Sequence, residues 1–228
     1  MHNRRYNVSF IQKRQNFTET GENCIDVTML NEISDEVKKY NARLLPVIKG
    51  RETEEISKVY SQGFREFGEN RLEELLDHKS NFKDCHFHFI APLQSRKIPE
   101  ILENSKSVHT VSRLKEVEKI DLLYKNHEIF VQINIDNDSK KSGINLNDVQ
   151  MFFEKFENYS FFPNGIMCIP DINSDPRESF KNMNDINQKL LDNYKQYNGE
   201  LSMGMSSDYK IALDYGATII RVGSKIFK

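Results

Sequence analysis

The chain has 228 residues, of which 38% are hydrophobic and 29% charged, and its formal net charge at pH 7 is −2. This balance is typical of a soluble globular protein, and so small a charge gives no overall attraction to nucleic acid or to an anionic membrane. Since no apolar run could span a bilayer and the basic N-terminus lacks the apolar core of a signal peptide, we expect a cytoplasmic protein that binds neither nucleic acid nor membrane.

Two regions differ in pattern. Residues 1–25 are polar and weakly patterned, and we treat them as an N-terminal extension ahead of a single domain that covers residues 26–228. Within that domain, short apolar stretches rich in Val, Ile and Phe alternate with amphipathic helical patterns. The predicted strands cover residues 44–48, 64–68, 87–91, 107–111, 129–135, 165–169, 200–205 and 217–223.

The alternation of strands and helices determines the predicted fold. It indicates parallel strands joined by helical crossovers, and eight such units predict a closed (β/α)8 TIM barrel. An open, doubly wound sheet is the alternative, but such a sheet normally carries a Gly-rich dinucleotide turn after its first strand. Neither that G-x-G-x-x-G pattern nor a Walker pattern occurs in the sequence. We therefore predict the barrel.

Polar residues follow several of the predicted strands. In a barrel, active residues lie at the carboxyl ends of strands, so these positions are candidates for a site. The first of these residues along the chain is Lys49. A lysine at the end of a strand is usually only solvated, but a half-buried amine has a lowered pKa and can attack a carbonyl group. The set comprises Lys49, Asn70, Gln94, Asn134, Asp136, Ser206, Arg221, Gly223 and Ser224.

The last two strand ends predict a phosphate site. Barrels often bind phosphate with the loops after strands seven and eight. Ser206 and Ser207 begin a predicted helix, whose free N–H groups favour an anion, although either serine could serve only as a helix cap. Gly223 would let the backbone approach a ligand beside the Ser224 hydroxyl. A reactive lysine and a phosphate cradle together suit one cofactor, pyridoxal 5′-phosphate (PLP), whose aldehyde forms a Schiff base with lysine.

Longer motifs support this interpretation: LLPVIK (44–49), FREFGENRLEELL (64–76), FHFIAPLQSRK (87–97) and SMGMSSDYKIALDYGATIIRVGSKIF (202–227). In these motifs the chain resembles the pyridoxal phosphate homeostasis protein family, whose barrel is similar to the N-terminal domain of alanine racemase. The resemblance implies that Lys49 is the PLP-binding lysine and that Arg221 lies near the pyridine nitrogen. It also implies that Ser206, Gly223 and Ser224 hold the phosphate, and that Asn70 and His88 line the ring side of the pocket.

The resemblance also implies a function. It suggests a non-catalytic, monomeric protein that holds PLP as a lysine Schiff base, keeps free PLP low and supplies it to apo forms of PLP-dependent enzymes. The alternatives are a PLP-dependent amino-acid racemase and a cofactor-free barrel in which Lys49 is structural. Racemases of this fold take a second base from a C-terminal β-domain, whereas this sequence ends at Lys228, so we expect no racemase activity.

Two further residue patterns bear on the chemistry. Arginine does not readily give up a proton, so Arg221 would keep the pyridine nitrogen unprotonated and weaken the cofactor as an electron sink.

His86 and His88 share one face of a predicted strand and could suggest a metal site. No third ligand has a convincing spacing, so we expect no metal and a hydrogen-bonded role for histidine.

Overall fold

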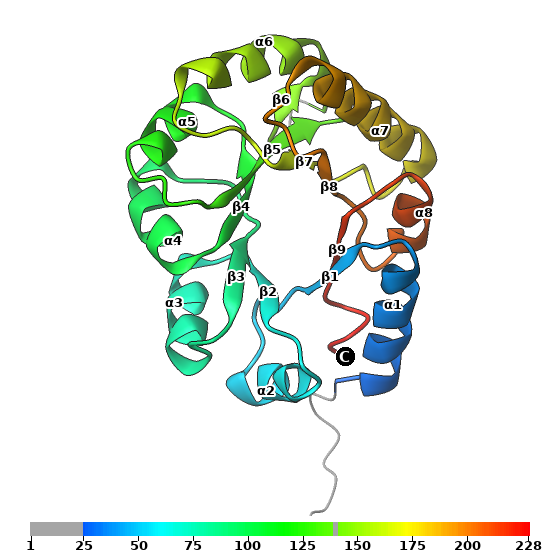
Figure 1. Cartoon of the computed structure of the whole chain (residues 1–228). Helices are drawn as coiled ribbons and strands as arrows, with labels where there is room; N and C mark the ends of the chain where they lie inside the picture. Colours follow the sequence, from blue (N-terminus) through cyan, green and yellow to red (C-terminus); the bar gives the residue numbers. More distant parts are fainter. Residues whose placement is uncertain (1–24, 139–140) are drawn as a thin grey trace, which may run out of the picture.

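Parallel strands form a ring with helices around it in the computed structural model, which describes residues 25–138 and 141–228 (Figure 1). The strands of the ring confirm the predicted barrel, and each overlaps one of the predicted strands. They are β1 (Arg43–Pro46), β2 (Glu66–Glu69), β3 (His86–Phe89), β4 (Ser107–Val111), β5 (Glu128–Asn134), β7 (Gly165–Met167), β8 (Glu200–Ser202) and β9 (Ile219–Val222).

The strands follow the order β1-β9-β8-β7-β5-β4-β3-β2 around the ring, and the very short β6 (Ile144–Asn145) pairs with β5 off this path. A single parallel bridge between Val47 and Gly68 joins the first and last strands of this order. The N–H of Ile48 also donates to the carbonyl of Gly68 at 3.0 Å. These contacts bring the carboxyl ends of β1 and β2 together, so the ring is nearly closed.

The helices cover the outside of the ring (Figure 1). Each presents an apolar stripe to the strands; in the second helix, Ile56 and Val59 are completely buried. Among the described residues, no helix has the length and apolar character to cross a bilayer. The α-helices are α1 (Val27–Lys39), α2 (Thr53–Ser61), α3 (Leu72–Asn81), α4 (Ile98–Asn104), α5 (Leu114–Asp121), α6 (Val149–Glu154), α7 (Pro176–Asn193) and α8 (Tyr209–Asp214), and short 3-10 helices cover Ser95–Lys97, Leu146–Asp148 and Lys155–Asn158.

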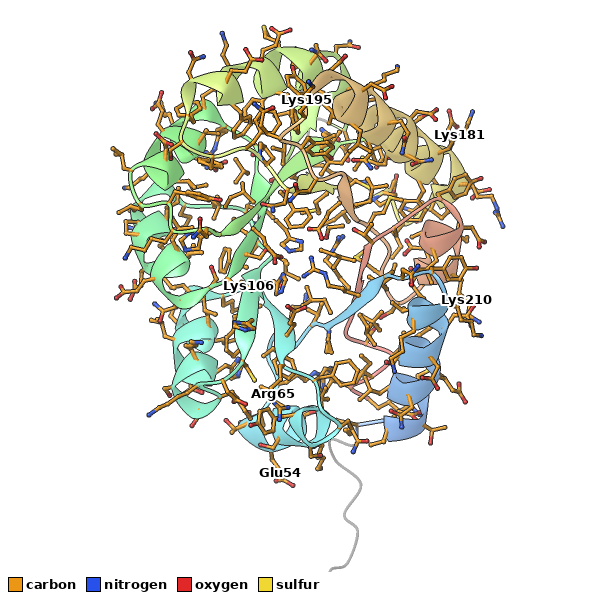
Figure 2. All side chains as sticks on the ribbon, in the orientation of Figure 1. Glu54, Arg65, Lys106, Lys181, Lys195 and Lys210 are labelled. Atoms are coloured by element: carbon orange, nitrogen blue, oxygen red, sulfur yellow. The ribbon has the colours of Figure 1, made fainter. Side chains whose placement is uncertain are left out.

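The inside of the ring is filled by side chains (Figure 2). Charged groups gather at the amino ends of the strands, where Arg43 donates to Glu200 at 2.9 Å and lies 3.4 Å from Glu128. Lys106 bridges Glu66 at 3.1 Å and Glu128 at 3.0 Å. These pairs neutralise most of the charge at this end of the barrel.

An apolar cluster also lies inside the ring. It is separate from the larger core between strands and helices, and it consists of Leu45, Phe130, Met167 and Ile219, with the partly buried Ile90 against them. Apart from Ile25, which bridges Phe227, the predicted N-terminal extension lies outside the described residues.

Candidate functional site

Lys49 lies at the carboxyl end of β1, in an exposed turn directly after the fully buried Ile48. The turn continues through Gly50, whose φ of +66° belongs to the left-handed region that glycine adopts without strain. The N–H of Gly50 donates to the Glu74 carboxylate of α3 at 2.7 Å. The turn that carries Lys49 is therefore fixed to the neighbouring helix rather than held by β1 alone.

Arg221 lies in β9, where it is in register with Leu45 of β1, and only 4% of its surface is exposed. Its Nη1 donates to Ser202 Oγ at 2.7 Å and its Nη2 donates to the Cys168 carbonyl at 3.0 Å. Burial lowers the pKa of this guanidinium. In the described part of the chain no carboxylate lies within ion-pair distance of it, so its charge is available to an acceptor on a ligand.

Gly223 brings the end of β9 close to β1. A Cβ at this position would lie 3.0 Å from the Val47 carbonyl oxygen, and the N–H of Val47 donates to the Val222 carbonyl at 2.8 Å. Val47 is two residues before Lys49, and the exposed Ser224 follows Gly223. Since larger side chains would separate the strands here, glycine permits the close approach of the β9 loop to the Lys49 turn.

The prediction that Ser206 begins a helix is wrong by three residues, because α8 begins at Tyr209. Ser206 and Ser207 lie in the preceding turn, where the Asp208 side chain accepts the N–H of Met205 at 2.6 Å. Asp208 therefore makes the local hydrogen bond that the helix-cap alternative assigned to serine. Within the described ranges, the hydroxyl of Ser206 makes no hydrogen bond to protein, nor does that of Ser224.

Asn70 follows β2 in a loop that a buried carboxylate organises. Glu69 Oε1 accepts the N–H groups of Asn70 at 2.6 Å and Arg71 at 3.3 Å, while its Oε2 lies 3.1 Å from Nδ1 of His78. The Oδ1 of Asn70 is buried and has no hydrogen-bond partner in the described part of the chain. A buried acceptor of this kind is costly unless a ligand or water supplies a donor.

His88 lies inside the barrel on β3, with 1% of its surface exposed. Its Nδ1 is 3.0 Å from Nε2 of His109, and Nδ1 of His109 is in turn 2.8 Å from Ser202 Oγ. His88 is thus a hydrogen-bonded histidine, the role that we expected over that of a metal ligand. Neither His109 nor Ser202 is predicted as a site residue from the sequence, although Ser202 begins one of the motifs that carry the family resemblance.

Five of the predicted site residues lie on three neighbouring strand ends. Lys49 follows β1, Ser206 follows β8, and β9 between them carries or precedes Arg221, Gly223 and Ser224. Asn70 follows β2, which bridges β1, whereas His88 lies within β3. The buried guanidinium, the unengaged hydroxyls and the unpaired amide oxygen fit a phosphorylated pyridine with a polar ring edge, as PLP is.

The sequence is similar to known proteins over most of its length. Residues 29–228 match the family of the alanine racemase N-terminal domain. The pyridoxal phosphate homeostasis protein of Vibrio cholerae is 34% identical over 208 residues, which cover 82% of this chain and 85% of that protein. The protein of the same name from Schizosaccharomyces pombe is 30% identical over 220 residues, covering 91% and 92%.

Solved structures show the same barrel. PipY of Synechococcus elongatus, in a structure without PLP, is 25% identical with a TM-score of 0.83, and the match covers 88% of this chain and 99% of PipY. A PipY structure with PLP bound gives a TM-score of 0.80 at 24% identity. Alanine racemase of Corynebacterium glutamicum, at 12% identity and a TM-score of 0.68, shares the fold over 90% of this chain and 62% of the racemase.

Proposed function

The chain belongs to the pyridoxal phosphate homeostasis protein family, and from this we propose that it binds PLP reversibly, with Lys49 as its point of covalent attachment. One observation carries the proposal. A buried guanidinium, that of Arg221, has no carboxylate partner in the described part of the chain and lies on the strand next to the one that Lys49 follows. A buried cation of this kind favours a ligand that brings acceptor groups.

Each candidate residue has a role in this proposal. PLP supplies an aldehyde that condenses with a primary amine, so Lys49 would hold it as a Schiff base. The Ser206 and Ser224 hydroxyls and the backbone at Gly223 would hold the phosphate, and Arg221 would donate to the pyridine nitrogen. Asn70 and His88 would line the ring side.

The proposed protein holds PLP rather than using it for catalysis. Arg221 keeps its protons, so it would leave the pyridine nitrogen unprotonated and the ring a poor electron sink. Cys168, whose carbonyl binds Arg221, cannot supply a base at neutral pH because burial raises the pKa of its thiol to about 12. Lys49 and Ser224 are exposed, which would let apo forms of PLP-dependent enzymes receive the cofactor.

Two measurements on one sample test the proposal. PLP added to the purified protein should give the yellow absorbance of a lysine Schiff base, and the band should be absent in Lys49→Ala. The α-proton of L-alanine should then exchange no faster in heavy water than with free PLP. A missing band would exclude the site, and rapid exchange that disappears in Lys49→Ala would identify an enzyme instead.

A further inference from the structure

A series of buried side chains, joined by hydrogen bonds, crosses the barrel interior from Arg221; we call it the hydrogen-bonded chain. From the guanidinium, the contacts run to Ser202 on β8 at 2.7 Å, to His109 on β4 at 2.8 Å and to His88 on β3 at 3.0 Å. Nε2 of His88 then lies 3.9 Å from a carboxylate oxygen of Glu66, the first residue of β2. The chain therefore links the candidate site to the charged cluster at the amino ends of the strands.

The two ends of this chain determine its direction. A guanidinium can only donate hydrogen bonds, so Ser202 Oγ accepts from Arg221 and its own proton is left for Nδ1 of His109. His109 then carries its proton on Nε2 and donates it to Nδ1 of His88. His88 in turn carries its proton on Nε2, which makes no hydrogen bond within the described residues but faces the Glu66 carboxylate at 3.9 Å. Every bond therefore points away from Arg221.

The opposite direction would leave two groups badly placed. If His109 donated to Ser202, the serine would accept twice, and the described residues offer no other acceptor for its buried hydroxyl proton. A neutral His88 would then turn the lone pair of Nε2 toward the Glu66 carboxylate. The opposite direction therefore costs an unpaired buried hydroxyl and a lone pair facing an anion, whereas the first direction leaves only the Nε2–H of His88 unpaired and turns it toward that anion.

The charge states along the chain agree with one direction. Burial holds the pKa of His109 well below its usual value, with the positive charge of Arg221 adding to the effect, so His109 is neutral. At the far end, the His88 imidazole and the Lys106 ammonium hold the pKa of the Glu66 carboxyl at about 2. Glu66 is therefore an anion at neutral pH, and Nε2 of His88 faces a negative charge.

We propose that Ser202 and His109 are positioning residues, which hold the Arg221 guanidinium in one orientation toward the cofactor through this one-way chain. Because the guanidinium is planar, fixing Nη1 on Ser202 and Nη2 on the Cys168 carbonyl also fixes the directions of its remaining N–H groups. The ring of His109 is itself held by stacking on Phe130, with 4.3 Å between the ring centroids. The role toward PLP rests on the proposed function, whereas the direction of the chain does not.

The direction can be measured on the wild-type protein without PLP. Two-bond nitrogen–proton NMR of the imidazoles distinguishes the tautomers, and His109→Phe identifies the His109 signals. His127 is an internal reference, because its Nδ1 accepts the N–H of Lys125 and its Nε2 faces the Leu102 carbonyl at 2.8 Å. We expect His109 to show the same Nε2–H tautomer as His127. An Nδ1–H tautomer or an imidazolium at neutral pH would overturn the one-way chain.

A PLP titration tests the positioning role. Ser202→Ala should weaken PLP binding roughly tenfold or more and shift the absorbance band of bound PLP, because Arg221 loses a fixed acceptor. Ser107→Ala is the matched control. Ser107 is equally buried, but it donates to the Glu128 carbonyl and takes no part in the series of hydrogen bonds from Arg221 to His88. Ser202→Thr, which keeps the hydroxyl, should restore the band.

The outcomes separate the two proposals. If the wild-type protein binds no PLP, the proposed function fails, while the NMR result still decides the direction of the chain. If the wild type binds PLP and Ser202→Ala matches Ser107→Ala in affinity and absorbance, Ser202 has no positioning role. Should Ser202→Ala not fold, His109→Phe, which retains a ring to stack on Phe130, provides the same comparison.

Discussion

Glu69 and His78 do not line the candidate site but hold one of its loops in place. Both are buried, and the carboxylate of Glu69 binds the imidazole of His78 while accepting the backbone N–H groups at the start of the Asn70 loop. Burial opposes a charged imidazole, but the Glu69 carboxylate outweighs it and raises the pKa of His78. The pair therefore anchors the loop after β2 to α3.

This pair should make stability depend on pH. A histidine whose folded pKa is raised stabilises the protein fully below its unfolded value near 6.5, and that contribution is lost as pH rises through the folded pKa. His78→Gln should therefore lower the free energy of unfolding by roughly 1–3 kcal/mol at about pH 5.5 and by less at about pH 9. Urea denaturation at both pH values measures this difference.

An exposed histidine supplies the control. His86→Gln removes an imidazole at the exposed start of β3 and should change the free energy of unfolding little at either pH. If His78→Gln lost the same free energy at both pH values, the charge of the imidazole would play no part in the stability of the loop.

Some residues of the candidate site could be predicted from the sequence, and others could not. Lys49 and Arg221 could be predicted as candidates because each lies at the end of an apolar strand whose pattern is local. Ser202 and His109 could not, since their contact joins residues 93 positions apart and exists only when the barrel closes. Sequence periodicity places both residues on strands but cannot show which side chains meet inside the ring.

At the scale of elements, the loops after β8 and β9 form the proposed phosphate site. The β8 loop packs tightly on α8, because a Cβ at Gly204, whose φ is +91°, would lie 2.6 Å from the Cβ of Ala212. The β9 loop is held against β1 at Gly223. These contacts fix the backbones beside Ser206 and Ser224 before any ligand binds.

Removing either hydroxyl should weaken PLP binding. A charge-assisted hydrogen bond to phosphate contributes roughly 1.5–3 kcal/mol, so Ser206→Ala or Ser224→Ala should raise the dissociation constant about tenfold or more. Ser207→Ala is the control in the same turn, where the side chain is exposed. Titrations with PLP and unphosphorylated pyridoxal measure the effect, and equal wild-type affinity for both would argue against a phosphate site.

The predicted and observed bounds of the strands and helices differ in places, and the differences have a physical cause. The predicted strands overlap the observed ones because β-branched and aromatic runs are buried on the helix-facing side. The sequence predicts the start of α8 too early because a serine pair resembles a helix cap, whereas the Asp208 side chain closes a turn on Met205 instead. Competition among neighbouring polar side chains for the same N–H groups is not visible in periodicity.

At the scale of the whole molecule, the two ends of the barrel differ in chemistry. The amino ends of the strands carry paired charges around Arg43 and Lys106, whereas the carboxyl ends carry Lys49 and a guanidinium without a carboxylate partner among the described residues. The apolar cluster around Leu45 and Phe130 fills part of the interior as well. The ion pairs of Arg43 and Lys106 thus lie at the end of the barrel opposite the strand ends proposed to bind the cofactor.

The most direct test of this account is reduction of the PLP-loaded protein with borohydride, followed by peptide mapping. With one equivalent of PLP, we expect the pyridoxyl group on Lys49, and Lys49→Ala should remain folded because an exposed side chain leaves no cavity. Lys58→Ala, on α2, should be labelled at Lys49 like the wild type. Labelling of other lysines alone, or equal labelling of Lys49→Ala, would contradict the account.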